Sequence, residues 1–205
     1  MRDRDATTFV YSLIALPNMS ENPQKLYIDA RTLLINSVKL ARLVWADEFR
    51  PSCLVSIWRG GTPPGIAIQE FFRVCGHKPH HTVIRAQSYE GTRRGKGGVE
   101  INGLGDVIAT IKPDDRLLII DDVFDTGHTM VAILEGIMAG VGPKAPECRV
   151  ATVYYKPKNN ETALEPNYYT VADSRWIVFP HEIMGLTDDE LRRRRTQLYE
   201  AALAD

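Results

Sequence analysis

Four consecutive aliphatic residues, Leu-Leu-Ile-Ile at positions 117–120, constrain the possible fold more than any other feature of the sequence. A strand with one face in water alternates apolar and polar side chains, whereas an unbroken apolar run is typical of a strand covered on both faces. Strands of this kind occur in parallel sheets that carry helices on both sides. The run therefore predicts an α/β fold, with a parallel core sheet flanked by helices.

The rest of the chain alternates between strand-like and helix-like patterns, which supports the same fold class. Asp29 is placed to cap the first helix, and the prolines at positions 63 and 64 fit the first turn of the second. The predicted strands are residues 26–28, 54–57, 82–84, 117–120 and 150–154, and the predicted helices are residues 30–46, 63–73 and 129–138.

Two β-prone pieces, residues 168–171 and 176–179, look appended to this core, and a final helix follows them. Thr187 and Glu190 form the capping-box pattern that opens this helix. We interpret the four consecutive arginines at residues 192–195 as a solvated helix face, because three acidic residues open the same helix.

Composition argues against two classes of partner. The chain has 205 residues, and 25 Lys and Arg residues balance 26 Asp and Glu residues for a net charge of −1. This balance argues against a nucleic acid or a membrane surface as partner.

Three widely spaced cysteines are typical of reduced thiols, and no apolar run reaches the roughly 20 residues of a membrane span. We therefore expect a cytoplasmic protein.

The residues that follow the aliphatic run carry most of the chemistry. Asp121, Asp122 and Asp125 end the predicted strand, and a Thr-Gly-His-Thr turn at residues 126–129 leads into the predicted helix. In open α/β sheets, ligands bind outside the carboxyl ends of the strands. The N–H groups of such a turn form a nest for a phosphate dianion, and the threonine hydroxyls add donors.

The acidic residues need partners of their own. Two adjacent carboxylates at the end of an apolar strand are costly unless they face vicinal hydroxyls or a hard cation. An ordinary strand-to-helix turn with an aspartate cap would explain one acid and one threonine, but not three acids. We therefore interpret the segment as a ligand site.

Residues 117–129 resemble the phosphoribosyl pyrophosphate (PRPP) signature of type I phosphoribosyltransferases, which has four apolar residues, two acids, two apolar residues and Asp-Thr-Gly-x-Thr. The match covers all thirteen positions, with His128 at the variable one. The resemblance extends from about residue 26 to residue 182, and over this range the chain is similar to the family branch that salvages 6-oxopurines. It implies an enzyme that joins a purine base to PRPP.

The resemblance implies a set of residues that hold PRPP. The loop at residues 56–61, Ser-Ile-Trp-Arg-Gly-Gly, is similar to the pyrophosphate loop, in which the bond corresponding to Trp58–Arg59 is often cis. Asp122 and Glu182 are the implied ligands for Mg²⁺. The implied PRPP-binding residues are Arg59, Gly60, Gly61, Asp121, Asp122, Thr126, Gly127, His128 and Thr129.

The resemblance also implies how the base is held. Lys156 corresponds to the lysine that contacts the 6-oxo group, and Trp176 with Ile177 corresponds to the pair that stacks on the ring and reads its 2-position. An ammonium donates but cannot accept, so Lys156 favours a carbonyl oxygen over the amine of adenine. Asp125 would reach N7 and act as the general base while pyrophosphate leaves.

A glycine-rich, basic stretch at residues 87–100 resembles the loop that closes over the site, beginning at Ser88 and Tyr89. Its few apolar groups predict weak order without ligand, and its closure would exclude water from a cationic transition state. An arginine- and glycine-rich segment can also bind RNA, so this alternative stays open.

Together these features predict transfer of the 5-phosphoribosyl group from PRPP to N9 of a free 6-oxopurine base, with Mg²⁺ as cofactor. The chain would form one domain, with a hood from about residues 1–28 and 160–205, in a homo-oligomer that is a dimer or a tetramer. One alternative is a phosphoribosyltransferase for another base, such as a pyrimidine. The other is a PRPP- or nucleotide-sensing regulator that binds RNA through Arg93, Arg94 and the arginine run.

Overall fold

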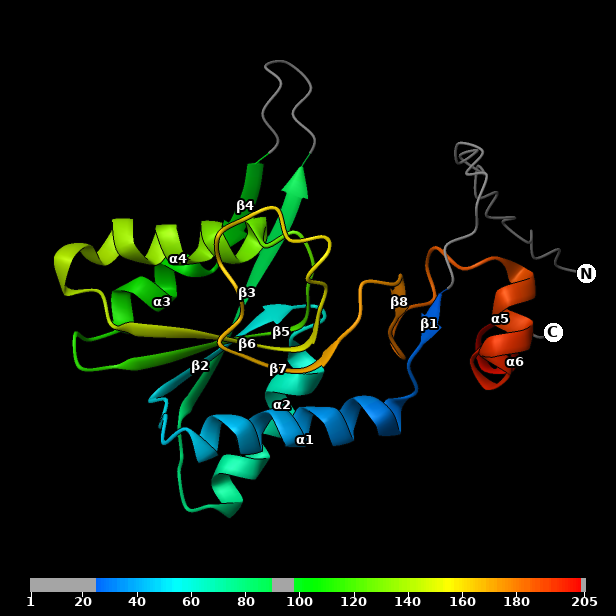
Figure 1. The fold of residues 1–205 in the computed structure, drawn as a ribbon, viewed down its shortest axis with the longest axis horizontal. Coiled ribbons are helices and arrows are strands. Elements are labelled where there is room, and N and C mark those ends of the chain that lie inside the picture. The colour runs from blue at the N-terminus through cyan, green and yellow to red at the C-terminus, as the bar shows by residue number, and fades with distance from the viewer. Residues whose placement is uncertain (1–24, 90–97, 204–205) are drawn as a thin grey trace, which may run out of the picture.

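The computed structural model describes residues 25–89 and 98–203, and Figure 1 shows how their helices and strands are arranged. A six-stranded sheet forms the core, in the order β4-β3-β2-β5-β6-β7. Neighbouring strands run parallel except β3 and β4, which are antiparallel. The strands are β2 (Cys53–Trp58), β3 (His80–Tyr89), β4 (Gly98–Asn102), β5 (Arg116–Phe124), β6 (Glu147–Tyr155) and β7 (Tyr168–Ala172).

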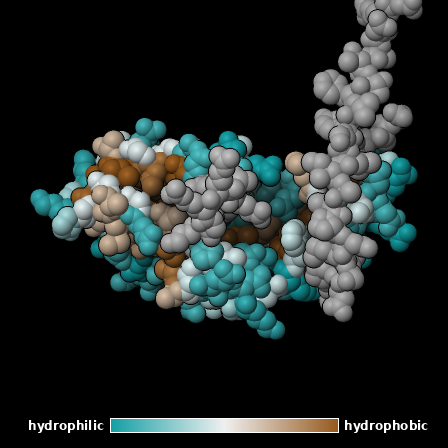
Figure 2. Space-filling model, turned by 90° about the horizontal axis from the view of Figure 1, so that it is seen from above, coloured by the Kyte–Doolittle hydropathy of each residue, from teal (hydrophilic) through white to brown (hydrophobic). Residues whose placement is uncertain are grey.

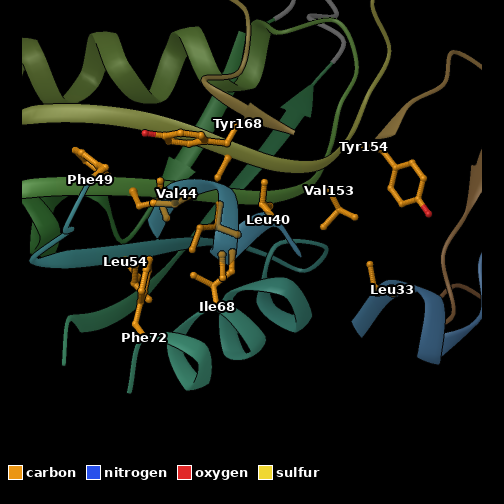
Figure 3. Close-up of a cluster of buried hydrophobic side chains, with 14 of the residues drawn as sticks. Leu33, Leu40, Val44, Phe49, Leu54, Ile68, Phe72, Val153, Tyr154 and Tyr168 are labelled. Carbon is orange, nitrogen blue, oxygen red and sulfur yellow. The ribbon is translucent and has the colours of Figure 1, made fainter. Parts of the chain in front are cut away.

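Helices cover both faces of this sheet, which confirms the predicted fold class (Figure 1). They are α1 (Ala30–Ala46), α2 (Thr62–Val74), α3 (Leu104–Thr110) and α4 (His128–Val141), and a 3-10 turn at Gly142–Lys144 follows α4. In β5, Leu118 and Ile120 pack with α1 and α2 in the core shown in Figure 3. Leu117 and Ile119 pack with α3 and α4. The aliphatic run therefore has no polar member because both of its faces are buried.

A second, small sheet lies apart from the core sheet, in the segments where the sequence predicts a hood (Figure 1). It pairs β1 (Leu26–Tyr27) in parallel with β8 (Ile177–Val178), and α5 (Asp188–Arg194) and α6 (Thr196–Leu203) follow. Residues 192–194 are exposed, as expected for a solvated face. Arg195 instead turns inward and donates to the backbone oxygens of Ile28 (2.8 Å) and Val178 (3.1 Å). The last arginine therefore ties the C-terminal helices to the hood sheet.

One prediction about the edges of the core sheet is wrong. The sequence suggests that residues 168–171 are appended to the core, but β7 pairs with β6 as an edge of the core sheet. The predicted lid region, residues 87–100, begins and ends in strands, because β3 continues to Tyr89 and β4 begins at Gly98. Residues 90–97, the centre of the predicted lid, lie outside the described residues. Strand pairing depends on distant neighbours, so a short local pattern does not reveal it.

The outer surface of α4 is unusually apolar. Its 14 residues include one acid, Glu135, and no Lys or Arg. The Met138 side chain on this helix is 64% exposed, and Figure 2 shows apolar residues gathered over α4 toward the left of the view. Helices that are apolar on most sides are usually covered by other protein. A homo-oligomer would supply such cover, and it stays a prediction.

A partly buried polar network joins α2 to the sheet. The Ser56 hydroxyl lies 2.8 Å from His81 Nε2, and His81 Nδ1 lies 3.2 Å from Gln69 Oε1. Because the glutamine oxygen only accepts, Nδ1 carries the proton and the Ser56 hydroxyl donates to Nε2. Burial lowers the pKa of His81 below its ordinary 6.5, so the ring is held neutral.

We expect this histidine to make the folded protein sensitive to acid. The unfolded chain protonates His81 as the pH falls through about 6.5, whereas the folded ring resists protonation, so stability is lost below that pH. Thermal melts at a series of pH values should show a smaller acid-induced loss for His81→Gln than for the wild type. His80→Gln removes the exposed neighbour whose charge is the second cause of the lowered His81 pKa, so it should reduce the acid-induced loss less than His81→Gln does. Equal slopes for all three proteins would contradict the prediction.

Candidate active site

The strands β2, β3 and β5 end at a cleft of about 580 Å³. The hood contributes to its wall through the residues that follow β8. Sequence-predicted site residues in the wall are Arg59, Gly60, Asp121, Asp122, Thr129 and Glu182, and they are joined by Trp58, Arg85, Gln87 and His181. Segments that are distant in the sequence therefore meet at one hollow, at the edge of the sheet where ligands bind in this class of fold.

The loop between β2 and α2 packs directly on the acidic end of β5. The Trp58–Arg59 peptide bond is cis, as predicted. A Cβ atom on Gly60 would overlap the carboxylate of Asp122, and a Cβ atom on Gly61 would overlap the Ile120 backbone oxygen of β5. Both positions therefore require glycine, and a larger residue would push the loop away from the acids.

Asp121, which is half-buried, and Asp122, which is buried, form an acidic pair in the wall of the cleft. Burial raises the pKa of Asp121 well above 3.8, and the charge of Asp122 adds to the rise. Burial also raises the pKa of Asp122, to about 7, with the charge of Glu182 as the second cause. The nearest cationic candidate, His181 Nε2, lies 3.7 Å from Asp122 Oδ2, beyond hydrogen-bond distance. Within the described part of the chain, the pair therefore has no hydrogen-bonded cation.

The Thr-Gly-His-Thr turn leads into α4, as predicted. Gly127 has a φ of 88°, and a Cβ atom on it would lie 2.5 Å from the Thr162 hydroxyl, so the turn requires glycine. The Glu161 N–H donates to the Thr126 carbonyl over 3.0 Å. The Glu161 carboxylate also pairs with His128 at 2.8 Å. The segment after β6 thus holds the turn that offers the free N–H groups of a helix start.

Two of the predicted base-side residues, Asp125 and Lys156, lie next to one another. The Lys156 N–H donates to the Phe124 carbonyl over 2.9 Å, which joins the ends of β5 and β6. Lys156 Nζ donates to Asp125 Oδ2 over 2.7 Å, and Asn159 Nδ2 donates to Asp125 Oδ1 over 2.8 Å. The Asp125 side chain is 42% exposed, whereas the Lys156 side chain is 9% exposed. A buried cation therefore faces an acid that a ligand can reach.

The remaining predicted residues differ in how they can meet a ligand. Trp176 precedes β8, and its side chain is 59% exposed, so its ring is available for stacking. Ile177 is buried in the core beneath α1, so only its backbone can reach a ligand. Ser88 and Tyr89 lie at the end of β3, where they pair with the start of β4.

Comparison with known protein families identifies the family of this chain. A sequence profile of the phosphoribosyl transferase domain family matches residues 24–183. The chain belongs to this family. The matched range includes the glycine loop, the acidic strand end, the threonine turn and β8. No curated protein sequence matches the chain.

Solved structures share the phosphoribosyltransferase fold. A purine phosphoribosyltransferase from Pyrococcus horikoshii is 27% identical, with a TM-score of 0.62 over 80% of this chain and 98% of that one. A xanthine-guanine-hypoxanthine phosphoribosyltransferase from Helicobacter pylori is 21% identical, with a TM-score of 0.61 over 84% and 99%. A Neisseria gonorrhoeae protein with bound ppGpp is 17% identical, with a TM-score of 0.68 over 87% and 99%. The Helicobacter pylori and Neisseria gonorrhoeae proteins are similar to this chain in fold alone.

Several residues of this phosphoribosyltransferase site are not predicted from the sequence, and two of them contact predicted site residues or their neighbours. His181 lines the cleft and stacks on Phe179, with ring centroids 5.8 Å apart. Asn159 contacts Asp125 across 34 positions of the chain. Neither belongs to a recognisable motif. The proline that follows Lys156 predicts a turn at the end of β6, and this was the one available signal for Asn159.

Proposed function

We infer that this phosphoribosyltransferase joins a 6-oxopurine to PRPP through N9 and releases a purine 5′-mononucleotide and pyrophosphate. The observation that carries the proposal is the pairing of Asp125 with Lys156, whose Oδ2 and Nζ atoms lie 2.7 Å apart. The pair offers one hydrogen-bond acceptor beside one donor.

This pattern matches one edge of a 6-oxopurine. O6 and N7 of such a base lie on the same edge, where adenine carries an amino group in place of O6. With a proton on N7, the free base presents an acceptor and a donor side by side. Lys156 can donate to O6 while Asp125 accepts from N7, whereas the amino group of adenine would face donors only. A pyrimidine has no N7 to complete the match.

The same geometry supports a role for Asp125 as general base. The bond from N9 to C1′ of PRPP forms while the bond from C1′ to the pyrophosphate oxygen breaks, and the N7 proton passes to Asp125. The partial exposure of Asp125 leaves room for the base to approach, and the exposed Trp176 ring can stack on it.

PRPP would lie across the acidic strand end. Its 5′-phosphate suits the threonine turn at the start of α4, and its pyrophosphate suits the glycine loop with Arg59. Asp122 and Glu182 would hold Mg²⁺, which typically uses one or two carboxylates together with water and substrate oxygens. Bound Mg²⁺ supplies charge neutralisation to the pyrophosphate.

Lys156→Gln should narrow the preference for 6-oxopurines over adenine. Glutamine can turn either its NH₂ or its oxygen toward position 6, whereas lysine offers donors only. Mispaired buried polar groups cost about 1–3 kcal/mol, so the wild type should prefer hypoxanthine, guanine or xanthine by about ten- to two-hundred-fold in kcat/KM. The measurement is pyrophosphate release with each base at saturating PRPP and Mg²⁺.

Lys158→Ala is the matched control, because Lys158 is exposed in the same turn, and it should keep the wild-type ratio. A wild type that prefers adenine, or an unchanged ratio in Lys156→Gln, would remove Lys156 from this role. If pyrophosphate were released only with a pyrimidine, the substrate would be a pyrimidine rather than a 6-oxopurine. No release with any base would favour a nucleotide-sensing regulator.

A further inference from the structure

The turn after β6 brings a neutral amide to the base-side carboxylate. It is closed by a hydrogen bond of 3.0 Å from the Asn159 N–H to the Lys156 carbonyl. Farther on, the Glu161 N–H donates to the carbonyl of Thr126, the residue directly after Asp125. Both hydrogen bonds hold this segment against the end of β5. The Asn159 side chain is thereby placed to donate to Asp125 Oδ1 over 2.8 Å.

Hydrogen bonds, rather than packing, must orient the Asp125 carboxylate. Its side chain is 42% exposed, and the final torsion of an aspartate has only broad preferences. Lys156 donates to Oδ2 and Asn159 donates to Oδ1, so each oxygen has one side-chain donor. Because a carboxylate only accepts, the Asn159 amide must present its NH₂ group.

The two donors are suited to different tasks. The Lys156 ammonium has three donors that rotate on a flexible stem, and in the proposed function it also donates to O6 of the purine. The Asn159 amide is neutral, and within the described residues its side chain is hydrogen-bonded to Asp125 Oδ1, so it serves this one acceptor. We propose that Asn159 is a positioning residue, which holds Oδ1 of Asp125 so that Oδ2 stays directed at N7 while Lys156 engages position 6. This inference rests on the proposed function.

Two substitutions test whether the donor matters. Asn159→Leu keeps a similar volume without a donor, and Asn159→Asp keeps the shape but replaces the donor with a second carboxylate. Both should lower kcat with the preferred purine by about ten- to a hundred-fold, as expected when a hydrogen bond to a charged group is lost. KM for PRPP should stay within about threefold, because the phosphate and pyrophosphate contacts are untouched. Lys158→Ala, in the same turn, should keep the wild-type kcat.

A binding measurement separates positioning from damage to the fold. 9-Deazahypoxanthine has carbon at position 9, so it cannot be ribosylated there, and it keeps the N7–H that Asp125 would accept. Calorimetry with PRPP and Mg²⁺ present should show about tenfold weaker binding of this analogue to Asn159→Leu than to the wild type. The Kd for PRPP alone should stay within about twofold of the wild-type value.

Each outcome has a distinct meaning. Wild-type kcat and analogue affinity in Asn159→Asp would overturn the positioning role and leave the proposed function intact. A parallel loss of PRPP binding in both Asn159 variants would show a structural role for the turn and would also overturn it. No turnover by the wild type with any purine would overturn the proposed function, and this inference with it.

Discussion

Asp125→Asn should lower kcat with the preferred purine by at least about 100-fold. Asparagine has nearly the same size and can still accept a hydrogen bond, but it cannot take up the N7 proton. General bases typically contribute about 10²–10⁴-fold, so the loss should appear in the chemical step. The Kd for PRPP should change little, because the threonine turn and the glycine loop remain. Single-turnover kinetics and PRPP titration measure the two quantities separately.

Glu165→Gln is the control for loss of one negative charge, since Glu165 is exposed on the segment between β6 and β7. Its kcat should stay near the wild-type value. Turnover of Asp125→Asn within about threefold of the wild type would remove Asp125 from the base role, because a general base supplies far more than that. Equal losses of PRPP binding and turnover would instead indicate that the substitution damages the site as a whole.

The parts of the fold that could be predicted are those set by local patterns. The first helix runs over residues 30–46 as expected, and the Asp29 side chain accepts from the Thr32 N–H over 2.7 Å at its start. The aliphatic run in β5 fixes the fold class because both of its faces need cover. By contrast, α3 has 7 residues, too few for a clear helical period, and it begins after Gly103 with a φ of 85°.

The residues of the candidate site also differ in whether a local pattern predicts them. The acids and the threonine turn are adjacent in the sequence, so one motif predicts both. Lys156 pairs with Asp125 across 31 positions, and only the family resemblance brings them together in advance. Asn159 and His181 have no such motif. Their contacts depend on how the turn after β6 and the end of β8 are placed, which is a property of the tertiary structure.

Asp122→Asn should stabilise the ligand-free protein while it lowers turnover. The pKa of Asp122 is about 7 in the folded protein, against an ordinary value of 3.8. Between these values the folded side chain keeps a proton that the unfolded one has lost, so stability falls as the pH rises from about 4 to about 7. The substitution removes this cost but leaves the half-buried Asp121 beside the new amide, so we expect a rise in Tm of roughly 2–4 °C, the effect of about 1 kcal/mol in a chain of this size.

Thermal melts of both proteins at about pH 4 and about pH 8 test this, because near pH 4 the unfolded carboxyl still holds much of its proton and the difference between the two states costs little stability. The two Tm values should be similar at low pH, and Asp122→Asn should melt higher at high pH. Mg²⁺ with PRPP should stabilise the wild type more than the variant, since the variant lacks one proposed ligand to the metal. A variant that melts lower at both pH values would show that the carboxylate supports the ligand-free fold. The buried charge would then be satisfied by contacts within the protein rather than kept for a bound cation.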